Sequence, residues 1–253
     1  MSDNGASTDS PSAPQWRPVA RPRSHELVIA AVEDQIMSGA LTVGDPLPPE
    51  RELAARLEVS RAGVREAIRV LEAQGVVRSN VGAGPLAGTF IASMPSAALT
   101  RFLRLHVALS NFPMTDIIDA RVMLERNSAT LAASHVDAAT LASIHTPLAA
   151  MDVPELGCEP FNDADTDFHV AIAEASGNRL VADMTVAIRA SLREPILRAM
   201  RRVPDWPSLR STLQHQHQTI YDAVAAGDGE RAADLTERHI RAAFDALPAL
   251  GDD

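Results

Sequence analysis

The sequence predicts a mainly α-helical protein with two domains, the first of which adds a β-hairpin to three helices. Three observations support this prediction. The chain has 253 residues, which is enough for two compact cores. Apolar residues recur at helical spacing in three stretches before residue 75, and two short β-prone runs follow them. Beyond residue 96 only helical patterns occur, so we expect the second domain to be an all-α helical bundle.

The composition favours a globular protein with no membrane partner. Hydrophobic residues make up 46% of the chain, but no apolar run approaches the roughly 18–20 residues that a membrane helix needs. The N-terminus lacks the apolar core of a secretory signal. A single cysteine, Cys158, excludes an internal disulfide; we expect it in a loop and assign it no role. These features predict a cytoplasmic protein.

The net charge of −10 is unevenly distributed along the chain. Residues 1–15 are rich in Ser, Pro and Asp, and we expect them to form a disordered tail. Residues 16–94 carry equal numbers of arginines and acidic side chains, and the acidic excess lies mainly after them. The N-terminal domain, which we place at residues 16–92, is therefore free to approach the phosphates of a nucleic acid.

Three helices are predicted in the N-terminal domain. The first begins at Ser24, the expected N-cap, and ends at Gly39. The second begins at Pro49, a residue type favoured in the first turn of a helix. A tight turn then leads to Ser60, the expected N-cap of a third helix that stops at Gly75. Two helices joined by such a turn are typical of a helix-turn-helix.

A β-hairpin is predicted directly after the third helix. Residues 76–78 and 89–91 are short β-prone runs, and the glycine-rich residues 79–88 between them are suited to a hairpin tip. Three helices followed by a hairpin form a winged helix-turn-helix, in which the third helix enters the major groove of DNA.

Arginines gather where the second and third helices begin. Arg61 and Arg65 are four residues apart on one face of the third helix, and Arg51 opens the second helix. A guanidinium can fork onto guanine or grip a phosphate, and Ser60 with its helix start also suits a phosphate. One such arginine would be interpreted as a solvated charge, but three in this pattern favour DNA contacts.

These stretches resemble the GntR family of transcription regulators, and the resemblance runs in order across residues 24–92. It rests on GDPLPPERELA at 44–54, VSRAGVREAI at 59–68 and LEAQGV at 71–76. It implies base or phosphate contacts by Arg51, Arg61 and Arg65, and a minor-groove contact by the wing near Gly82 and Gly84. The chain departs from the family pattern at Pro49, where Ser is common, and in three residues inserted before Gly88.

The second domain is predicted to contain seven helices. We place a linker at 93–97 and the domain itself at 98–250. Pro147 and Pro195 fall inside two of the predicted helices and are expected to kink or split them. The helices are predicted at 97–111, 115–135, 138–151, 160–176, 179–202, 206–227 and 229–247.

One aspartate and three histidines in this domain form a pattern that suits a metal ion. Asp165 and His169 are four residues apart and so share one helix face, while His217 and His239 lie on later helices. Neutral imidazoles with one carboxylate suit divalent ions such as Zn²⁺ or Ni²⁺. The sequence around these residues resembles the metal-binding effector domain of the FadR-like GntR subfamily, over roughly residues 98–247. His215 lies two residues from His217 and points elsewhere on a helix, and the family phrase favours His217.

Two further residues are candidates for binding an effector. Arg121 lies in a run that also fits the family and could pair with the carboxylate of a small organic acid. It could equally pair with Glu125 along its own helix. Asn178 could contact the ligand or could equally belong, with Gly177, to the C-cap of the helix that ends there.

The expected function is a ligand-responsive transcription regulator, with repression as the preferred sign, and not an enzyme. The resemblance implies a homodimer that binds double-stranded operator DNA, a divalent metal ion and a small organic acid. Two alternatives remain at this point. One is a metal-dependent enzyme acting on a small organic acid. The other is an effector domain of the non-metal, acyl-CoA-binding type, against which the presence of Asp165 and all three histidines argues.

Overall fold

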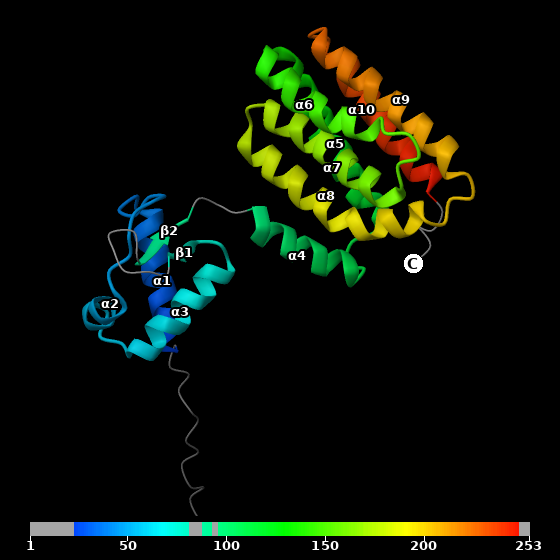
Figure 1. Cartoon of the computed structure of the whole chain (residues 1–253). Helices are drawn as coiled ribbons and strands as arrows, with labels where there is room; N and C mark the ends of the chain where they lie inside the picture. The colour runs from blue at the N-terminus through cyan, green and yellow to red at the C-terminus, as the bar shows by residue number, and fades with distance from the viewer. Residues whose placement is uncertain (1–22, 81–87, 93–95, 248–253) are drawn as a thin grey trace, which may run out of the picture. The chain divides into compact units, whose positions relative to one another are not determined.

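The computed structural model describes residues 23–80, 88–92 and 96–247 (Figure 1). The chain divides into two compact units, Met1–Ala92 and Ser93–Asp253. Gly82 and Gly84, predicted to form the wing tip, lie outside the described residues, as do the predicted tail and most of the linker. Among the described residues, no helix is both long and apolar enough to cross a membrane.

The N-terminal unit has the predicted order of three helices and a hairpin. They are α1 (Ser24–Met37), α2 (Glu50–Arg56), α3 (Arg61–Ala73), β1 (Val77–Asn80) and β2 (Gly88–Ile91). The two strands are antiparallel, and Val77 pairs with Ile91 at the base of the hairpin. Buried apolar residues from all five elements, including Val28, Leu53, Val64, Val77 and Ile91, form one core.

Two details of the helix starts show how α3 is positioned. Ser60 caps α3 as predicted, since its hydroxyl accepts a hydrogen bond from Gly63 N at 3.1 Å. Ser24 is not the cap of α1; it is the first helical residue, and the backbone N–H of Arg23 donates to Glu26 at 2.9 Å. Gly63 lies against this turn, where an added Cβ would come within 2.7 Å of the Cβ of Ser24. A glycine here allows α3 to approach the start of α1 closely.

The C-terminal unit consists of helices in its described part, as predicted, with boundaries within two or three residues of those expected. Figure 1 shows α5 to α10 running alongside one another as a bundle, and α4 packs against α8. The helices are α4 (Ser96–Ala108), α5 (Met114–Ser134), α6 (Ala138–Met151), α7 (Cys158–Ala175), α8 (Arg179–Met200), α9 (Trp206–Ala225) and α10 (Gly229–Ala246).

Two features of these helices bear directly on the sequence prediction: the two prolines and the position of Cys158. Pro147 and Pro195 lie inside α6 and α8, and neither proline splits its helix. Cys158 is the first residue of α7 and not part of a loop, because that helix starts two residues earlier than predicted.

Gly229 is the first residue of α10 and lies close to α5, since an added Cβ would lie 2.9 Å from the carbonyl oxygen of Thr130. This close contact positions α10, which carries one of the predicted metal ligands.

The interior of the bundle contains two clusters of apolar side chains and, in addition, a group of buried polar side chains. The larger cluster centres on Phe161 and Phe168 of α7 and Ile220 of α9. The smaller one includes Ile188 and Leu192 of α8, together with residues of α4, α5 and α10. Charged and polar side chains are nevertheless fully buried on α5, α7, α8, α9 and α10, and they form the site described next.

Candidate metal centre and DNA-binding surface

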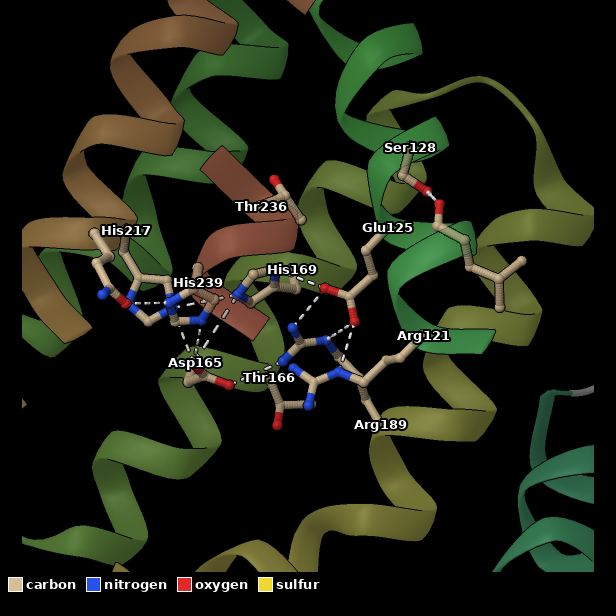
Figure 2. Close-up of polar contacts among 12 residues, drawn as sticks. Arg121, Glu125, Ser128, Asp165, Thr166, His169, Arg189, His217, Thr236 and His239 are labelled. Atoms are coloured by element: carbon tan, nitrogen blue, oxygen red, sulfur yellow. Dashed lines mark hydrogen bonds and ion pairs between the residues drawn. The ribbon is translucent and has the colours of Figure 1, made fainter. Parts of the chain in front are cut away.

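Asp165, His169, His217 and His239 are brought together in the interior of the bundle (Figure 2). Asp165 and His169 lie one turn apart on α7, His217 comes from α9 and His239 from α10. All four are buried, and one ligand atom from each lies within 4.8 Å of the others. His217 Nε2 is 2.9 Å from Asp165 Oδ1 and 3.2 Å from His169 Nε2. His239 Nε2 is 3.8 Å from the same carboxylate oxygen.

Each imidazole is held with its Nε2 atom facing the cluster. The Nδ1–H of His169 donates to Glu125 Oε2 at 2.9 Å, and that of His239 donates to Gln216 Oε1 at 2.9 Å. Hydrogen bonds of this kind fix the tautomer and leave the Nε2 lone pair available to a metal. His217 is oriented mainly by packing, since its ring lies edge-on to the ring of Phe168 with 5.0 Å between the two ring centroids.

The surroundings of His169 and His239 disfavour their protonated forms. Burial, followed by the nearby Arg189 charge, lowers the pKa of His169 to about 4. Burial and the neighbouring His217 and His169 hold the pKa of His239 well below its ordinary value. For Asp165, burial acts to raise the pKa, but Arg189 and the hydrogen bond from His217 outweigh it and hold the pKa well below the usual range. At neutral pH the ionised Asp165 carboxylate therefore faces the neutral imidazoles of His169 and His239.

A second group of charges supports this cluster from the α5 and α8 side (Figure 2). Arg189 of α8 donates to Asp165 Oδ2 at 2.9 Å and, through two nitrogens, to both oxygens of Glu125 at 2.9 and 2.6 Å. Arg121 Nε donates to Glu125 Oε1 at 2.8 Å. Although burial acts to raise the pKa of Glu125, Arg189, Arg121 and His169 outweigh it and keep this carboxyl ionised. The two carboxylates and two guanidiniums balance each other in charge.

The sequence interpretation missed most of this second group. Arg189 and Gln216 were not singled out, and Glu125 was considered only as a partner of Arg121. One signal could have indicated Arg189: it stands between Ile188 and the apolar Leu192 on a helix face that is otherwise buried. A charged residue fully buried in this way needs a partner of opposite charge. Nothing in the local sequence indicates that this partner lies on α5.

The cluster fits a divalent metal ion by the nature of its donor atoms. Three imidazole nitrogens and a carboxylate oxygen converge in a buried space, and these are electron-pair donors that a metal accepts. Such a convergence is unfavourable unless protons or a cation lie between the atoms. The second contacts of His169 and His239 are those of typical metal-ligating histidines. The buried group could therefore hold a divalent ion.

A cavity of about 30 Å³ lies directly beside the cluster. Asp165, His239 and Arg121 contribute its polar lining, and the rest comes from helices α5, α8, α9 and α10 and from Leu247 directly after α10. Arg121 pairs with Glu125, which is one of the two expectations made for it, and it also lines the cavity; its contact with an organic acid stays a prediction. Asn178 is exposed and caps α8, where its side chain accepts a hydrogen bond from Val181 N at 3.2 Å. It does not line this cavity.

The other histidine considered, His215, does not belong to the cluster. It lies two residues before His217 on α9, and its side chain is exposed while that of His217 is fully buried. The helical period turns the two side chains to different faces, as the sequence analysis assumed.

The predicted DNA-contacting residues that the structure describes are all exposed on the N-terminal unit. Arg51 at the start of α2 and Arg61 and Arg65 in the first turns of α3 are exposed, as is Ser60. Arg65 Nε is 3.4 Å from Glu50 Oε2, an exposed ion pair that phosphate or a base edge can replace at little cost. Arg56 and Arg69 pair with glutamates of their own helices, as expected for solvated charges.

Comparison with known proteins identifies both halves of the chain. The family described as "Bacterial regulatory proteins, gntR family" matches residues 25–86, and the FCD domain matches residues 116–242. The transcriptional regulator LutR of Bacillus subtilis (strain 168) is 31% identical over 216 residues, which are 84% of this chain and 95% of LutR. The chain belongs to the GntR family and carries an FCD domain.

Further comparisons agree with this GntR-family assignment. The Glc operon transcriptional activator of Escherichia coli (strain K12) is 26% identical to the chain, and the aligned region covers 85% of each protein. The solved structure of Streptococcus agalactiae GntR superimposes on this chain with a TM-score of 0.56 and 24% sequence identity. The match covers 86% of this chain and 98% of that one, and it supports the fold alone. The relatives are transcription regulators, so this GntR-family chain is a DNA-binding regulator and not an enzyme.

Proposed function

We propose that this GntR-family protein is a repressor whose FCD domain binds a divalent metal ion together with a small carboxylate. The observation that carries the proposal is the buried Asp165, His169, His217 and His239 cluster opening onto a cavity that also exposes Arg121. The carboxylate changes how tightly the winged helix-turn-helix binds operator DNA, because it binds more tightly to one arrangement of the protein than to another.

The metal part of the proposal names Zn²⁺ or Ni²⁺, both of which accept imidazole ligands readily. Asp165, His169, His217 and His239 would hold the ion. An ion with these four protein ligands can still accept one or two further oxygen atoms when it is five- or six-coordinate. When bound, the ion supplies positive charge and these open positions; Glu125 and Gln216 keep the imidazoles correctly oriented.

The carboxylate part rests on charge and on Arg121. The two guanidiniums and two carboxylates of the site already balance, so a divalent ion would leave an excess of two positive charges in a buried space. Uncompensated buried charge is strongly unfavourable, and an organic anion in the cavity reduces it. Arg121 makes its hydrogen bond to Glu125 through Nε, so its terminal amino groups remain for such an anion.

The size of the cavity explains how the anion can act as a signal. A volume of about 30 Å³ holds roughly two or three water molecules at about 10–15 Å³ each, which is less than most organic acids need. Binding therefore requires the surrounding helices to separate or tilt. A ligand that fits only an expanded bundle shifts the population toward it.

The operator part of the proposal assigns DNA contacts to Arg51, Ser60, Arg61 and Arg65, with Gly82 and Gly84 in the wing. Winged helix-turn-helix regulators commonly read two half-sites as symmetric dimers, and we propose the same for this chain. Repression is the sign we expect, although one relative is named an activator. A reporter gene under an operator found by selection distinguishes the two signs.

The experiment that tests the proposal measures DNA affinity by fluorescence anisotropy. Duplexes that bind the full chain are first selected from a random pool. The affinity for a selected duplex is then measured with Zn²⁺ and a panel of short carboxylic acids. We expect at least one acid to change the affinity several-fold only when metal is present, and the affinity to fall steeply with added salt. If no acid acts, or if each acts equally after the metal is chelated, the proposal is wrong.

A further inference from the structure

The cavity beside the metal cluster is polar at one end only. Its polar lining consists of Arg121, Asp165 and His239. Every other described residue in the lining is apolar, and all but Leu247, which directly follows α10, come from α5, α8, α9 or α10. Representative members are Ile118 of α5, Leu192 and Ile196 of α8, Leu213 of α9 and Phe244 of α10.

This apolar wall offers no side-chain partner for a charge. Among its described residues it contains no hydroxyl, amide or charged side chain. A carboxylate or hydroxyl group placed against it would lose its water without gaining a hydrogen bond, which is strongly unfavourable. A methyl or methylene group placed there would gain apolar burial instead.

From this one-sided lining we infer that the effector is a short monocarboxylate with an apolar tail. Its carboxylate faces Arg121 and the metal cluster, and its tail lies against Leu192, Ile196 and Phe244. The inference rests on the proposed function and narrows the class of acid: dicarboxylates and polyhydroxy acids are disfavoured. Because the cavity of about 30 Å³ must already expand to admit an acid, each further methylene group would require a larger separation of the helices, which favours a short tail.

The half-buried part of the wall is where the tail makes its contact. Ile196 and Phe244 are each partly exposed, whereas Leu192 and Leu213 at the inner side are fully buried. Ile196 packs against both apolar clusters but is only half-buried, so a side chain at this position borders the tail at the edge of the core. This makes Ile196 the specificity-determining position that is most open to substitution.

The test compares butanoate with succinate, which have the same number of carbons and differ by the second carboxylate. Each acid is titrated calorimetrically into the Zn²⁺-loaded full chain at neutral pH. We expect butanoate to bind at least about tenfold more tightly. Equal binding, or tighter binding of succinate, overturns this inference and leaves the proposed function standing. If no carboxylic acid binds the loaded protein, both are wrong.

A charged substitution in the wall provides the second arm of the test. Ile196→Arg places a cation where the second carboxylate of succinate would lie, and it is expected to shift the preference toward succinate by at least about tenfold. Leu180→Arg is the matched control, since Leu180 is an exposed residue of the same helix that does not line the cavity. An unchanged preference in a folded, metal-binding Ile196→Arg protein overturns the inference. If that variant does not fold, the comparison of the two acids decides.

Discussion

At the scale of single residues, Glu125 holds the site together. Its two oxygens accept hydrogen bonds from Arg121, Arg189 and His169, and its side chain is almost completely buried. Arg189 in turn connects it to Asp165. One carboxylate therefore compensates two buried guanidiniums and also orients a metal-ligand candidate.

Replacing Glu125 with glutamine is expected to destabilise the metal-free protein. Breaking a buried ion pair by removing one partner costs about 3–5 kcal/mol, because the remaining charges stay buried without compensation. Urea denaturation measures the change in the free energy of unfolding. Glu174→Gln, on the exposed face of α7, is the control and should lie within about 0.5 kcal/mol of the native protein. A Glu125→Gln protein as stable as this control would show that the charge network is unnecessary.

A pH dependence follows from the lowered pKa of His169. Its pKa is about 4 in the folded state, against an ordinary value of 6.5 when unfolded. Between these pH values the unfolded chain binds a proton that the folded chain does not, so acid favours unfolding. The metal-free protein should lose up to about 3 kcal/mol of stability from this residue as the pH falls from 6.5 to 4.

The carboxyls of Asp165 and Glu125 act in the same direction at lower pH. Their folded pKa values are lowered, so the stability they contribute is present above their unfolded pKa and is lost as the pH falls through the folded one. Urea denaturation at several pH values checks both effects. A metal-free protein whose stability is flat between pH 6.5 and 4.5 would contradict the neutral, buried imidazole that the geometry indicates.

At the scale of elements, the position of α3 in the DNA-binding unit is fixed by its cap and by its packing. Ser60 caps it, Gly63 allows it to pack closely on α1, and its apolar face is buried. Its opposite face is exposed and presents Arg61 and Arg65 from the first two turns. Packing therefore fixes which face of the helix points away from the core of its unit.

This placement predicts different effects for two arginines of the same helix. Arg65→Ala should weaken binding to a selected duplex by at least about 1 kcal/mol, the scale of one good base contact. Arg69→Ala is the matched control, because Arg69 lies one turn farther along and its charge is near Glu66. Fluorescence anisotropy measures both affinities. Equal losses for the two variants, or none for Arg65→Ala, would contradict the assignment of α3 as the recognition helix.

At the scale of the whole molecule, the sequence predicts the order of elements better than the contacts between them. Helical periodicity and breakers such as Gly177 and Gly227 placed every described helix within a few residues. Asp165, His169, His217 and His239 were identified from spacing and family resemblance, and the structure brings them together. Three local predictions were wrong: Ser24 as an N-cap, Asn178 as a C-cap and Cys158 in a loop. The first two depend on backbone geometry, and the third depends on the residue at which α7 begins.

The partners of buried charges could not be predicted in this way. Arg189 and Glu125 are 64 residues apart and on different helices, so no local pattern connects them. Periodicity shows which face of a helix is buried, but not which residue of another helix lies opposite. The one-sided lining of the cavity has the same origin, because five helices contribute to it.

The central claim is that four residues from three helices bind one divalent ion, and calorimetric titration of the metal-free full chain with Zn²⁺ and Ni²⁺ tests it most directly. We expect one ion per chain, with binding lost or greatly weakened in His217→Ala and retained in His215→Ala, whose side chain is exposed on the same helix. If the native chain takes up no ion, or if His217→Ala binds as tightly as the native chain, the claim is wrong.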